Sequence, residues 1–283
     1  MRTLPPRPGW GELSAGPFRA RARASRPRAG PLLPSRVHLA VVIPVYNEAR
    51  WVRACIERLH ATPPPTTPDG AACTREIILV DDGSTDGTRD IVRAMGEQGL
   101  VTPIFHEANR GKGAAIRTGF LRALERGAGV VLVHDADLEY DPADHARVLA
   151  PILDGRADAV IGSRFIGQTH RVLYYWHYLA NRFITTCCNA VTNLNLTDVE
   201  CCTKAFTGEA LRALTLTEDR FGIEIELVAK IARARLARPD APARRARVYE
   251  VAVAYDGRTY EEGKKIGWQD GVAALGCILK HGL

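Results

Sequence analysis

Two aspartates separated by a single residue follow an apolar run near the middle of the chain. Asp135 and Asp137 come directly after GVVLVH (129–134), a sequence typical of a buried β-strand. Carboxylates at one strand end can converge on a hard cation, and Mg²⁺ or Mn²⁺ binds through such oxygens together with the phosphate oxygens of a substrate. Because Asp-x-Asp is a common sequence, a solvated turn is the alternative interpretation of this pair alone.

A second polar segment, DDGSTDGT (81–88), follows the apolar run EIILV (76–80). Carboxylates in this position can accept hydrogen bonds from a base or from ribose hydroxyls, and the small Gly83 lets the backbone approach a ligand. A Ser, Thr or Asp of the same segment would also cap the next helix. Capping does not explain why two acids precede the glycine, so we expect a ligand-binding role as well.

A third segment, NRGKG (109–113), opens a helix-like stretch. Glycines on both sides of Lys112 at a helix N-terminus suit an anionic diphosphate. The segment is not a Walker A loop, because the Gly-Lys-Ser/Thr element is missing. No Gly-x-Gly-x-x-Gly follows the first apolar run either, which disfavours a nicotinamide site.

The elements that must position these residues alternate along the chain. Strands are predicted at 39–45, 76–80, 101–105, 129–134 and 158–162. Amphipathic helices are predicted near 49–60, 86–97, 111–126 and 143–154. Near-continuous apolar strands spaced by helices predict an α/β fold, with a mostly parallel sheet covered by helices on both faces. Ligands bind such sheets at the carboxyl ends of the strands, where three polar segments lie: YNE (46–48), DDGS (81–84) and DAD (135–137).

Beyond residue 163 the alternation is looser. A long stretch rich in aromatic and aliphatic residues covers 170–194, and a strand-like run, TDVECCTKAF, follows at 197–206. The remaining expected elements are helices near 208–214 and 222–236, a strand near 248–254 and a final apolar helix. The Pro-rich segment 62–74 is expected to be a surface insertion.

Charge and composition bound the function classes. The chain has 283 residues and a net charge of +6, but residues 1–37 hold eight Arg and a single acid, so the remainder is close to neutral. We therefore predict a disordered tail at 1–37, one folded domain at 38–283, and no nucleic-acid binding. Seven cysteines without a Cys-x-x-Cys indicate reduced thiols. No apolar stretch is long enough to span a bilayer and no secretory signal is visible, so we expect a cytoplasmic protein.

Five ordered motifs resemble those of family 2 glycosyltransferases. They are VIPVYNE (42–48), VDDGSTD (80–86), NRGKG (109–113), DAD (135–137) and GSRF (162–165). The resemblance runs from about 39 to 280 and is strongest to the dolichyl- or polyprenyl-phosphate mannose or glucose synthase branch. It implies the GT-A fold, a Rossmann-like nucleotide-diphospho-sugar transferase architecture. Residues 38–165 would form the nucleotide-sugar half and residues 166–283 the acceptor half.

The resemblance also implies roles for individual residues. Those that would bind the nucleotide sugar are Pro44, Tyr46, Glu48, Asp81, Asp82, Lys112, Asp135, Ala136, Asp137, Arg164, Arg258 and Lys264. Those that would hold Mg²⁺ or Mn²⁺ are Asp135, Asp137 and Glu139, the last standing where the synthases often have Gln. The implied reaction is an inverting transfer of a hexose from GDP-mannose or UDP-glucose to polyprenyl or dolichyl phosphate. A cation and basic side chains would stabilise the departing diphosphate.

The acceptor side leaves more alternatives open. Asp198 and Glu200 match a region beside the acceptor, and one of them would be the general base if the acceptor were a hydroxyl, as in glycan or secondary-metabolite synthesis. A polyprenyl phosphate is already anionic and needs little help from a base. Of the two acids in RFGIEIEL (220–227), one faces the site, or both stabilise their helix.

The stretch 170–194 carries the argument for a lipid. Its apolar residues fall on one side at helical spacing: Val172, Leu173, Tyr175, Trp176, Leu179, Phe183, Ile184, Cys187 and Val191. Aromatic residues with Arg suit a helix lying in a membrane interface, which would give peripheral contact at the inner face of the membrane. The alternatives are a helix packed on its own core and a homodimer contact.

Two other classes are weighed. A sugar nucleotidylyltransferase should carry a Gly-rich, Arg-containing loop after the first strand, where this chain has PVYNEARW (44–51). A non-catalytic nucleotide-binding module would be free to lose Asp135 or Asp137, and both are present.

Overall fold

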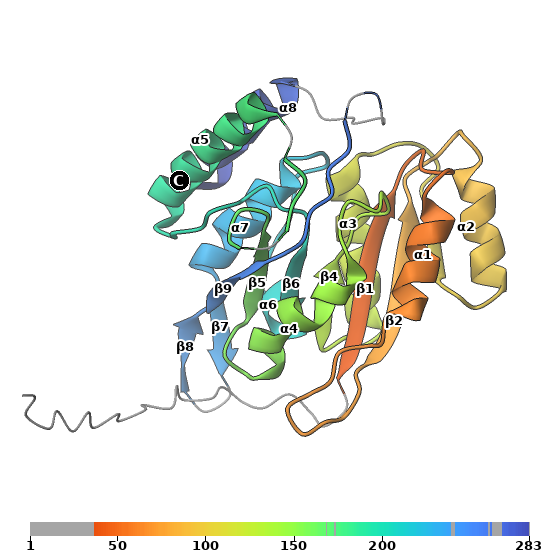
Figure 1. The fold of residues 1–283 in the computed structure, drawn as a ribbon. Coiled ribbons are helices and arrows are strands. Elements are labelled where there is room, and N and C mark those ends of the chain that lie inside the picture. The colour runs from red at the N-terminus through yellow and green to blue at the C-terminus, as the bar shows by residue number, and fades with distance from the viewer. Residues whose placement is uncertain are drawn as a thin grey trace, which may run out of the picture.

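The computed structural model describes residues 37–283 apart from 168, 173, 239–240, 260, 262–267 and 283. Lys264 and residues 1–36 of the predicted tail therefore lie outside the described residues. Figure 1 shows a central sheet with helices on both sides, so the predicted α/β architecture is confirmed.

The main sheet has seven strands in the order β3-β2-β1-β4-β6-β5-β9. Their bounds are β1 (His38–Val45), β2 (Thr74–Asp81), β3 (Thr102–Phe105), β4 (Val130–Val133), β5 (Ala159–Ser163), β6 (Lys204–Thr207) and β9 (Val248–Ala252). Only β6 runs antiparallel to its neighbours, β4 and β5. The predicted strands match these bounds closely, because apolar runs between helices mark buried parallel strands.

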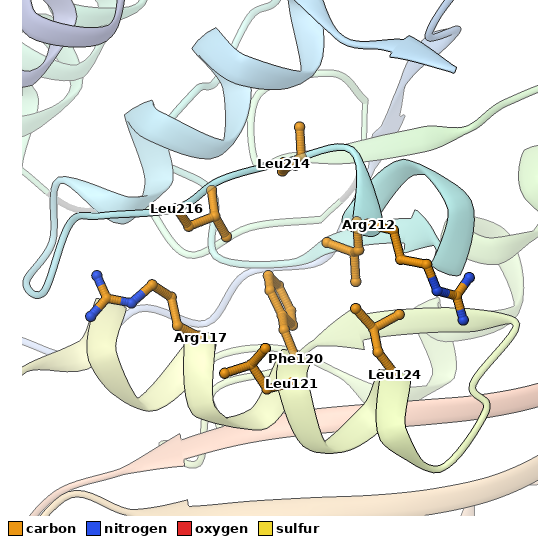
Figure 2. A pocket seen from close by; sticks show the side chains of 8 residues that line it. Arg117, Phe120, Leu121, Leu124, Arg212, Leu214 and Leu216 are labelled. Carbon is orange, nitrogen blue, oxygen red and sulfur yellow. The ribbon is translucent and has the colours of Figure 1, made fainter. Parts of the chain in front are cut away.

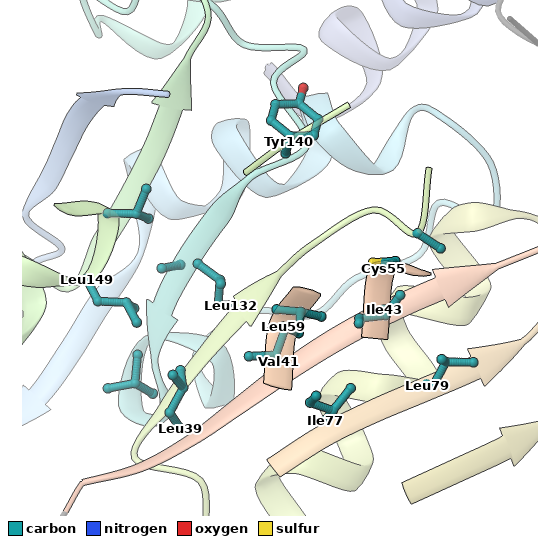
Figure 3. Close-up of a cluster of buried hydrophobic side chains, with 14 of the residues drawn as sticks. Leu39, Val41, Ile43, Cys55, Leu59, Ile77, Leu79, Leu132, Tyr140 and Leu149 are labelled. Atoms are coloured by element: carbon teal, nitrogen blue, oxygen red, sulfur yellow. The ribbon is translucent and has the colours of Figure 1, made fainter. Parts of the chain in front are cut away.

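The described helices lie on the two faces of this sheet, with one exception. They are α1 (Val52–Ala61), α2 (Thr88–Glu97), α3 (Lys112–Glu125), α4 (His145–Leu153), α5 (Tyr175–Thr192), α6 (Gly208–Arg212), α7 (Ile223–Arg233) and α8 (Trp268–Gly282), with a 3₁₀ turn at Pro142–Asp144. The exception is α8, which packs on α5 and α7. Alternate residues of β1 serve opposite faces. Val41 and Ile43 belong to an apolar cluster with side chains of α1, α2 and α4, and Figure 3 labels Leu59 of α1 and Leu149 of α4 beside them. Ala40 and Val42 belong to a second cluster, with side chains of α3, α6 and α7.

A third apolar cluster joins α5 to α7 and α8. The apolar side predicted for 170–194 is partly buried in this cluster and partly exposed to solvent. Ile184 is buried in this cluster, while Trp176 is 74% exposed and Phe183 58% exposed. The alternative of a helix packed on its own core is therefore right only for the second half of α5. In the described part of the chain, every helix is too short or too polar to cross a bilayer.

The predicted helix at 222–236 ends too late. Helix α7 stops at Arg233, and the chain enters an antiparallel hairpin of β7 (Arg235–Arg238) and β8 (Ala241–Arg245). Arg and Ala favour helices, but the sequence RPDAP (238–242) contains two prolines and an aspartate, a turn signal that the predicted elements did not use. Long-range contacts support the strand pairing, because Leu236 is buried in the core and Ala246 N–H donates to the Ala234 carbonyl at 3.0 Å.

All seven cysteines carry free thiols, as predicted. Cys55, Cys73, Cys188, Cys201 and Cys277 are buried. Burial raises the pKa of Cys188 and Cys277 to about 11 and of Cys55 and Cys201 to about 12. These thiols are therefore protonated near neutral pH and act as small apolar side chains.

Asp158, just before β5, ties the hairpin to the sheet. Its buried carboxylate accepts hydrogen bonds from Arg244 Nη2 at 2.6 Å and from Arg247 Nε at 3.1 Å and backbone N at 2.7 Å. Burial alone would raise the pKa of Asp158, but these bonds outweigh it and lower the pKa from 3.8 to about 2. A folded-state pKa below the unfolded one means that ionised Asp158 stabilises the fold.

We expect Asp158→Asn to lower the free energy of unfolding by about 2 kcal/mol at pH 7. The difference from wild type should be full above about pH 4 and shrink as the pH falls toward 2. Urea unfolding at pH 7 and pH 3 measures it. As a control, Asp154→Asn breaks a half-exposed pair with Arg156 and should change stability by less than about 1 kcal/mol. Equal effects of the two variants would contradict this role.

Candidate active site

Three polar segments meet at the carboxyl edge of the parallel strands. Asp81 ends β2 beside Val45 of β1, and Asp135 follows β4 on the other side of β1. The loops after β1 and β2 are joined directly, because Asn47 N–H donates to Ser84 Oγ at 2.9 Å and Thr85 N–H donates to Asn47 Oδ1 at 2.8 Å. The sequence prediction that these segments converge is confirmed.

The two acids at the end of β2 differ in how many hydrogen-bond donors of the protein contact their carboxylate oxygens. Asp82 is buried, and its carboxylate accepts from the backbone N–H groups of Arg110 at 3.0 Å and Gly111 at 2.7 Å and from His106 Nδ1–H at 2.6 Å. It therefore fixes the loop before α3. Asp81 Oδ2 is buried with no hydrogen-bond donor among the described residues, and Arg89 Nε lies 3.9 Å away.

Gly83 serves the chain itself. Its φ is +73°, and a Cβ there would lie 2.5 Å from the carbonyl carbon of Ala108. The glycine therefore permits contact between two loops of the protein, where the sequence suggested close approach to a ligand. Pro44 and Tyr46 lie at the end of β1 and just beyond it, and Tyr46 is 38% exposed.

The two aspartates after β4 flank a residue of the core. Ala136 is buried among apolar side chains, and Asp135 and Asp137 lie on either side of it. Lys112 Nζ, at the start of α3, lies 3.0 Å from Asp135 Oδ1 and 3.1 Å from Oδ2. The small apolar residue between the acids thus holds this turn against the core.

Arg258 contacts the remaining acids. Its Nη2 donates to Asp137 Oδ2 at 2.9 Å, its Nε donates to Glu139 Oε1 at 2.9 Å, and its Nη1 lies 3.6 Å from Glu48 Oε2. Glu139 also accepts from the Tyr255 hydroxyl at 2.8 Å. Of the three predicted metal-binding acids, Asp137 and Glu139 therefore share Arg258 as their counter-ion, and Asp135 has Lys112.

The chemistry of this donor set fits a divalent cation. No three His, Cys, Asp or Glu residues of the described chain are already arranged as a ready metal cluster. Burial and the neighbouring carboxylates of Asp135 and Glu139 nevertheless raise the pKa of Asp137 to about 7. Asp137 is therefore harder to ionise than a free carboxyl group, and the hard oxygen donors of these acids are those that Mg²⁺ and Mn²⁺ prefer.

A buried chain of alternating charges continues from Lys112 into the core. Glu224 of α7 lies 3.3 Å from Lys112 Nζ and pairs with Lys204, which is fully buried in β6. Burial alone would lower the pKa of Lys204, but Glu224 outweighs this effect and raises it. Glu226 instead accepts from the backbone of Thr217 and Glu218, so Glu224 is the acid of α7 that joins the site.

Sequence reasoning missed Lys204. The available signal was a lysine inside the apolar strand run TKAF, followed by two acids in the α7 sequence IEIE. A lysine in such a strand must either point to solvent or find a buried acid.

Asp198 and Glu200, the acids predicted on the acceptor side, form a second charged group with Arg164, which the resemblance assigns to the nucleotide sugar. Arg164 binds Asp198 in bidentate fashion, with Nε–Oδ2 at 2.6 Å and Nη2–Oδ1 at 2.8 Å, and its guanidinium lies 5.2 Å from the Tyr255 ring centroid. Burial alone would raise the pKa of Asp198, but Arg164 outweighs it and lowers the pKa. Burial and Glu224 raise the pKa of Glu200 to about 7. Asp198 is thus a fixed anion, whereas Glu200 titrates near neutral pH.

An apolar groove of about 400 Å³ lies elsewhere, between α3 and residues 211–216 (Figure 2). Phe120, Leu121 and Leu124 of α3 line it together with Leu214 and Leu216. None of the predicted site residues lines this groove, so it is separate from the charged edge of the sheet.

The sequence pattern described as Glycosyl transferase family 2 matches residues 40–215, which include all the carboxylates after β1, β2 and β4. The match covers more than half of the chain. The chain belongs to glycosyl transferase family 2.

Curated relatives of this family member are glycosyltransferases. Glycosyltransferase AglJ of Haloferax volcanii is 29% identical over 71% of this chain and 60% of its own. Polyprenol monophosphomannose synthase of Mycolicibacterium smegmatis is 29% identical over 62% of this chain and 64% of its own. Undecaprenyl-phosphate mannosyltransferase of Micrococcus luteus is 26% identical over 84% of this chain and 92% of its own. The chain thus spans less than two thirds of the first two relatives.

Solved structures establish the fold of this family 2 member. Glucosyl-3-phosphoglycerate synthase from Mycobacterium tuberculosis, in complex with Mn²⁺ and UDP-glucose, has a TM-score of 0.62 at 16% identity. The match covers 87% of this chain and 80% of that one. The predicted GT-A fold is confirmed.

The Lys204–Glu224 pair should be a strongly coupled part of the fold. Lys204→Met leaves Glu224 buried without its nearest cation and should lower the free energy of unfolding by about 3–5 kcal/mol. The double variant Lys204→Met/Glu224→Gln should recover much of this loss, because no buried charge is then unpaired. Chemical denaturation of both single variants and the double variant measures the coupling.

As a control, Arg93→Met breaks an exposed pair with Asp90 and should change stability by less than about 1 kcal/mol. If the two single effects simply add in the double variant, the pair is not coupled as described.

Proposed function

We propose that the protein is an inverting glycosyltransferase that moves a hexose from a nucleoside diphosphate sugar to a polyprenyl phosphate. The observation that carries the proposal is the set of three acids after β4, Asp135, Asp137 and Glu139, held beside Lys112 and Arg258 in a family 2 chain. The printed names of two relatives specify a polyprenol and an undecaprenyl phosphate, which supports the acceptor class. GDP-mannose and UDP-glucose are the proposed donors.

The donor would bind across the ends of β1, β2 and β4. Asp81 has a buried oxygen open for a base N–H or a ribose hydroxyl, and Tyr46 lies exposed at the same edge. Asp82 supports this pocket through the loop before α3. Pro44, Glu48 and Lys112 complete the proposed surroundings of the nucleotide.

Asp135, Asp137 and Glu139 would hold Mg²⁺ or Mn²⁺ next to the diphosphate. The bound cation would offset the negative charge that builds on the leaving diphosphate. A solved structure of similar fold contains Mn²⁺ with UDP-glucose, which supports a divalent cation. Lys112 and Arg258 add positive charge from the protein itself.

On the acceptor side, the guanidinium of Arg164 would bind the phosphate of the acceptor. Asp198 holds this guanidinium by two short hydrogen bonds, so Asp198 would act by positioning Arg164. A phosphate acceptor carries about −1.5 to −2 charge near neutral pH and attacks without a general base. Glu200 would act as a base only toward a hydroxyl acceptor.

The transfer reaction is tested with a donor panel. We expect release of nucleoside diphosphate from GDP-mannose or UDP-glucose when Mg²⁺ or Mn²⁺ and a short polyprenyl phosphate are supplied. Asp135→Ala and Asp137→Ala should each lower kcat by about 10²–10³-fold, because the leaving charge loses its main support. Coupled detection of the released diphosphate measures this rate.

The matched control is Asp141→Ala, which removes an acid from the same loop that pairs with Arg58 at its exposed surface. It should keep the wild-type rate to within about 2-fold. Equal release by wild type and Asp137→Ala would contradict the metal assignment.

A lipid acceptor also requires contact with a membrane surface, and the first half of α5 supplies a suitable face. Tyr175 is 65% exposed, Trp176 74% and Phe183 58%, with Arg182 beside them. Exposed aromatic residues with Arg suit the boundary between headgroups and acyl chains. We therefore propose peripheral docking of α5 on the membrane that carries the acceptor.

Trp176→Ser/Phe183→Ser should lower binding to anionic phospholipid vesicles by about 10-fold, because each ring contributes roughly 1.5–3 kcal/mol when buried. Co-sedimentation with vesicles measures this binding. Leu121→Ser, which changes a leucine 64% exposed on α3, is the control and should bind like wild type. Unchanged vesicle binding by the double variant would remove α5 as the docking face.

A further inference from the structure

Arg258 reaches the site from the segment after β9. The backbone of this segment is tied to the loop after β4, because Asp256 N–H donates to the Glu139 carbonyl at 2.9 Å and Arg258 N–H donates to Glu139 Oε1 at 3.1 Å. Tyr255 adds a bridge to Tyr140. The segment therefore lies directly on the carboxylates that would hold the cation.

The guanidinium of Arg258 lies among the acids of two different loops. It bonds Asp137 and Glu139 after β4 at 2.9 Å each and lies 3.6 Å from Glu48 after β1. The second oxygen of Asp137 accepts from Glu139 N–H at 3.1 Å. Both oxygens of Asp137 thus have donors from within the protein.

Lys112 is attached in a different way. Besides Asp135, its Nζ contacts Cys202 Sγ at 2.9 Å and Glu224 at 3.3 Å, and it lies in the first turn of α3. Glu224 is in turn held by buried Lys204. Lys112 is therefore part of the core network, whereas the side chain of Arg258 is bound only by the site's own acids among the contacts described.

We propose that Arg258 is an internal counter-ion that competes with the divalent cation for Asp137 and Glu139 and is released toward the diphosphate when the cation binds. Mg²⁺ requires oxygen ligands at about 2.0–2.1 Å in near-octahedral geometry, and Mn²⁺ prefers the same hard oxygen donors. The guanidinium of Arg258 lies between the carboxylates of Asp137 and Glu139, so these carboxylates point toward it. A cation on the same oxygens would also be repelled by the positive charge of Arg258. The proposal rests on the function proposed above.

Release of Arg258 would couple the two ligands. The cation takes over the carboxylates, and the guanidinium that leaves them becomes available to the anionic diphosphate, for which its planar fork is well suited. Binding of cation and nucleoside diphosphate should then favour each other, and this coupling must be equal in both directions.

The test is a Mn²⁺ titration of the full chain, followed by the electron paramagnetic resonance signal of free Mn²⁺. Without nucleotide, Arg258→Ala should bind Mn²⁺ at least about 5-fold more tightly than wild type, because the competing cation is gone. Arg58→Ala removes a half-exposed positive charge near the same loop without touching Asp137 or Glu139, and should change Mn²⁺ affinity by less than about 2-fold.

The second measurement repeats the titration with UDP and with GDP. In wild type, Mn²⁺ should tighten binding of one of these nucleotides, and Arg258→Ala should lower this enhancement by at least about 5-fold. Arg258→Gln provides the same comparison with a side chain of more similar size, and thermal unfolding confirms that each variant is folded.

The outcomes separate the two proposals. If wild type binds Mn²⁺ and both Arg258 variants bind it equally or more weakly without nucleotide, the counter-ion role is overturned and the proposed function stands. If wild type and both variants fail to bind Mn²⁺ even with nucleotide, the metal site and the proposed function are overturned together with it.

Discussion

The structure depends on charge compensation among acids that are withdrawn from water. Asp135, Asp137 and Glu139 follow β4 and are half-buried, and Lys112 links Asp135 to the buried Glu224 of α7. Several kcal/mol of hydration is lost for each buried ion, so such acids persist only beside cations and hydrogen-bond donors. Lys112, Lys204 and Arg258 supply the cations. The site is therefore organised by the need to offset its own negative charge.

The need for counter-ions connects the motif acids with residues from the C-terminal part of the chain. Lys204 comes from β6, which runs antiparallel between β4 and β5, and Arg258 comes from the segment after β9. Strands from the C-terminal part of the chain thus complete the same sheet whose parallel strands carry the motif acids. Removing that part of the chain would leave Asp137 and Glu139 without Arg258, one of the two cations that face the acids after β4. The carboxyl edge of the sheet is a property of the whole domain.

Most of the frame could be predicted from sequence, because its signals are local. Apolar runs marked the parallel strands, and the polar residues at their ends marked Asp81 and Asp135. The buried position of Lys204 was not predicted, because a lysine in a short strand is usually expected to be exposed. Its partner Glu224 lies 20 residues further along the chain. The β7–β8 hairpin was missed although the prolines of RPDAP (238–242) break a helix, because Arg and Ala on either side favour helices and the partner of Arg244, Asp158, lies far away in sequence. Local sequence propensity fails to predict an element when ion pairs with residues distant in sequence determine its structure.

The two cations that face the acids after β4 differ in their attachment, and this difference would reconcile a stable fold with the dication site proposed above. A site rich in carboxylates destabilises the empty protein unless positive charge is already present. Lys112 provides it permanently, because Cys202 and Glu224 hold it from behind. Arg258 provides it conditionally, since its guanidinium is bound by the acids themselves. If both cations were held in place like Lys112, they would repel an incoming dication permanently. If both were bound only by the acids, like Arg258, the empty site would have no fixed positive charge. One of each gives a site that is compensated when empty and open to exchange when its ligands arrive.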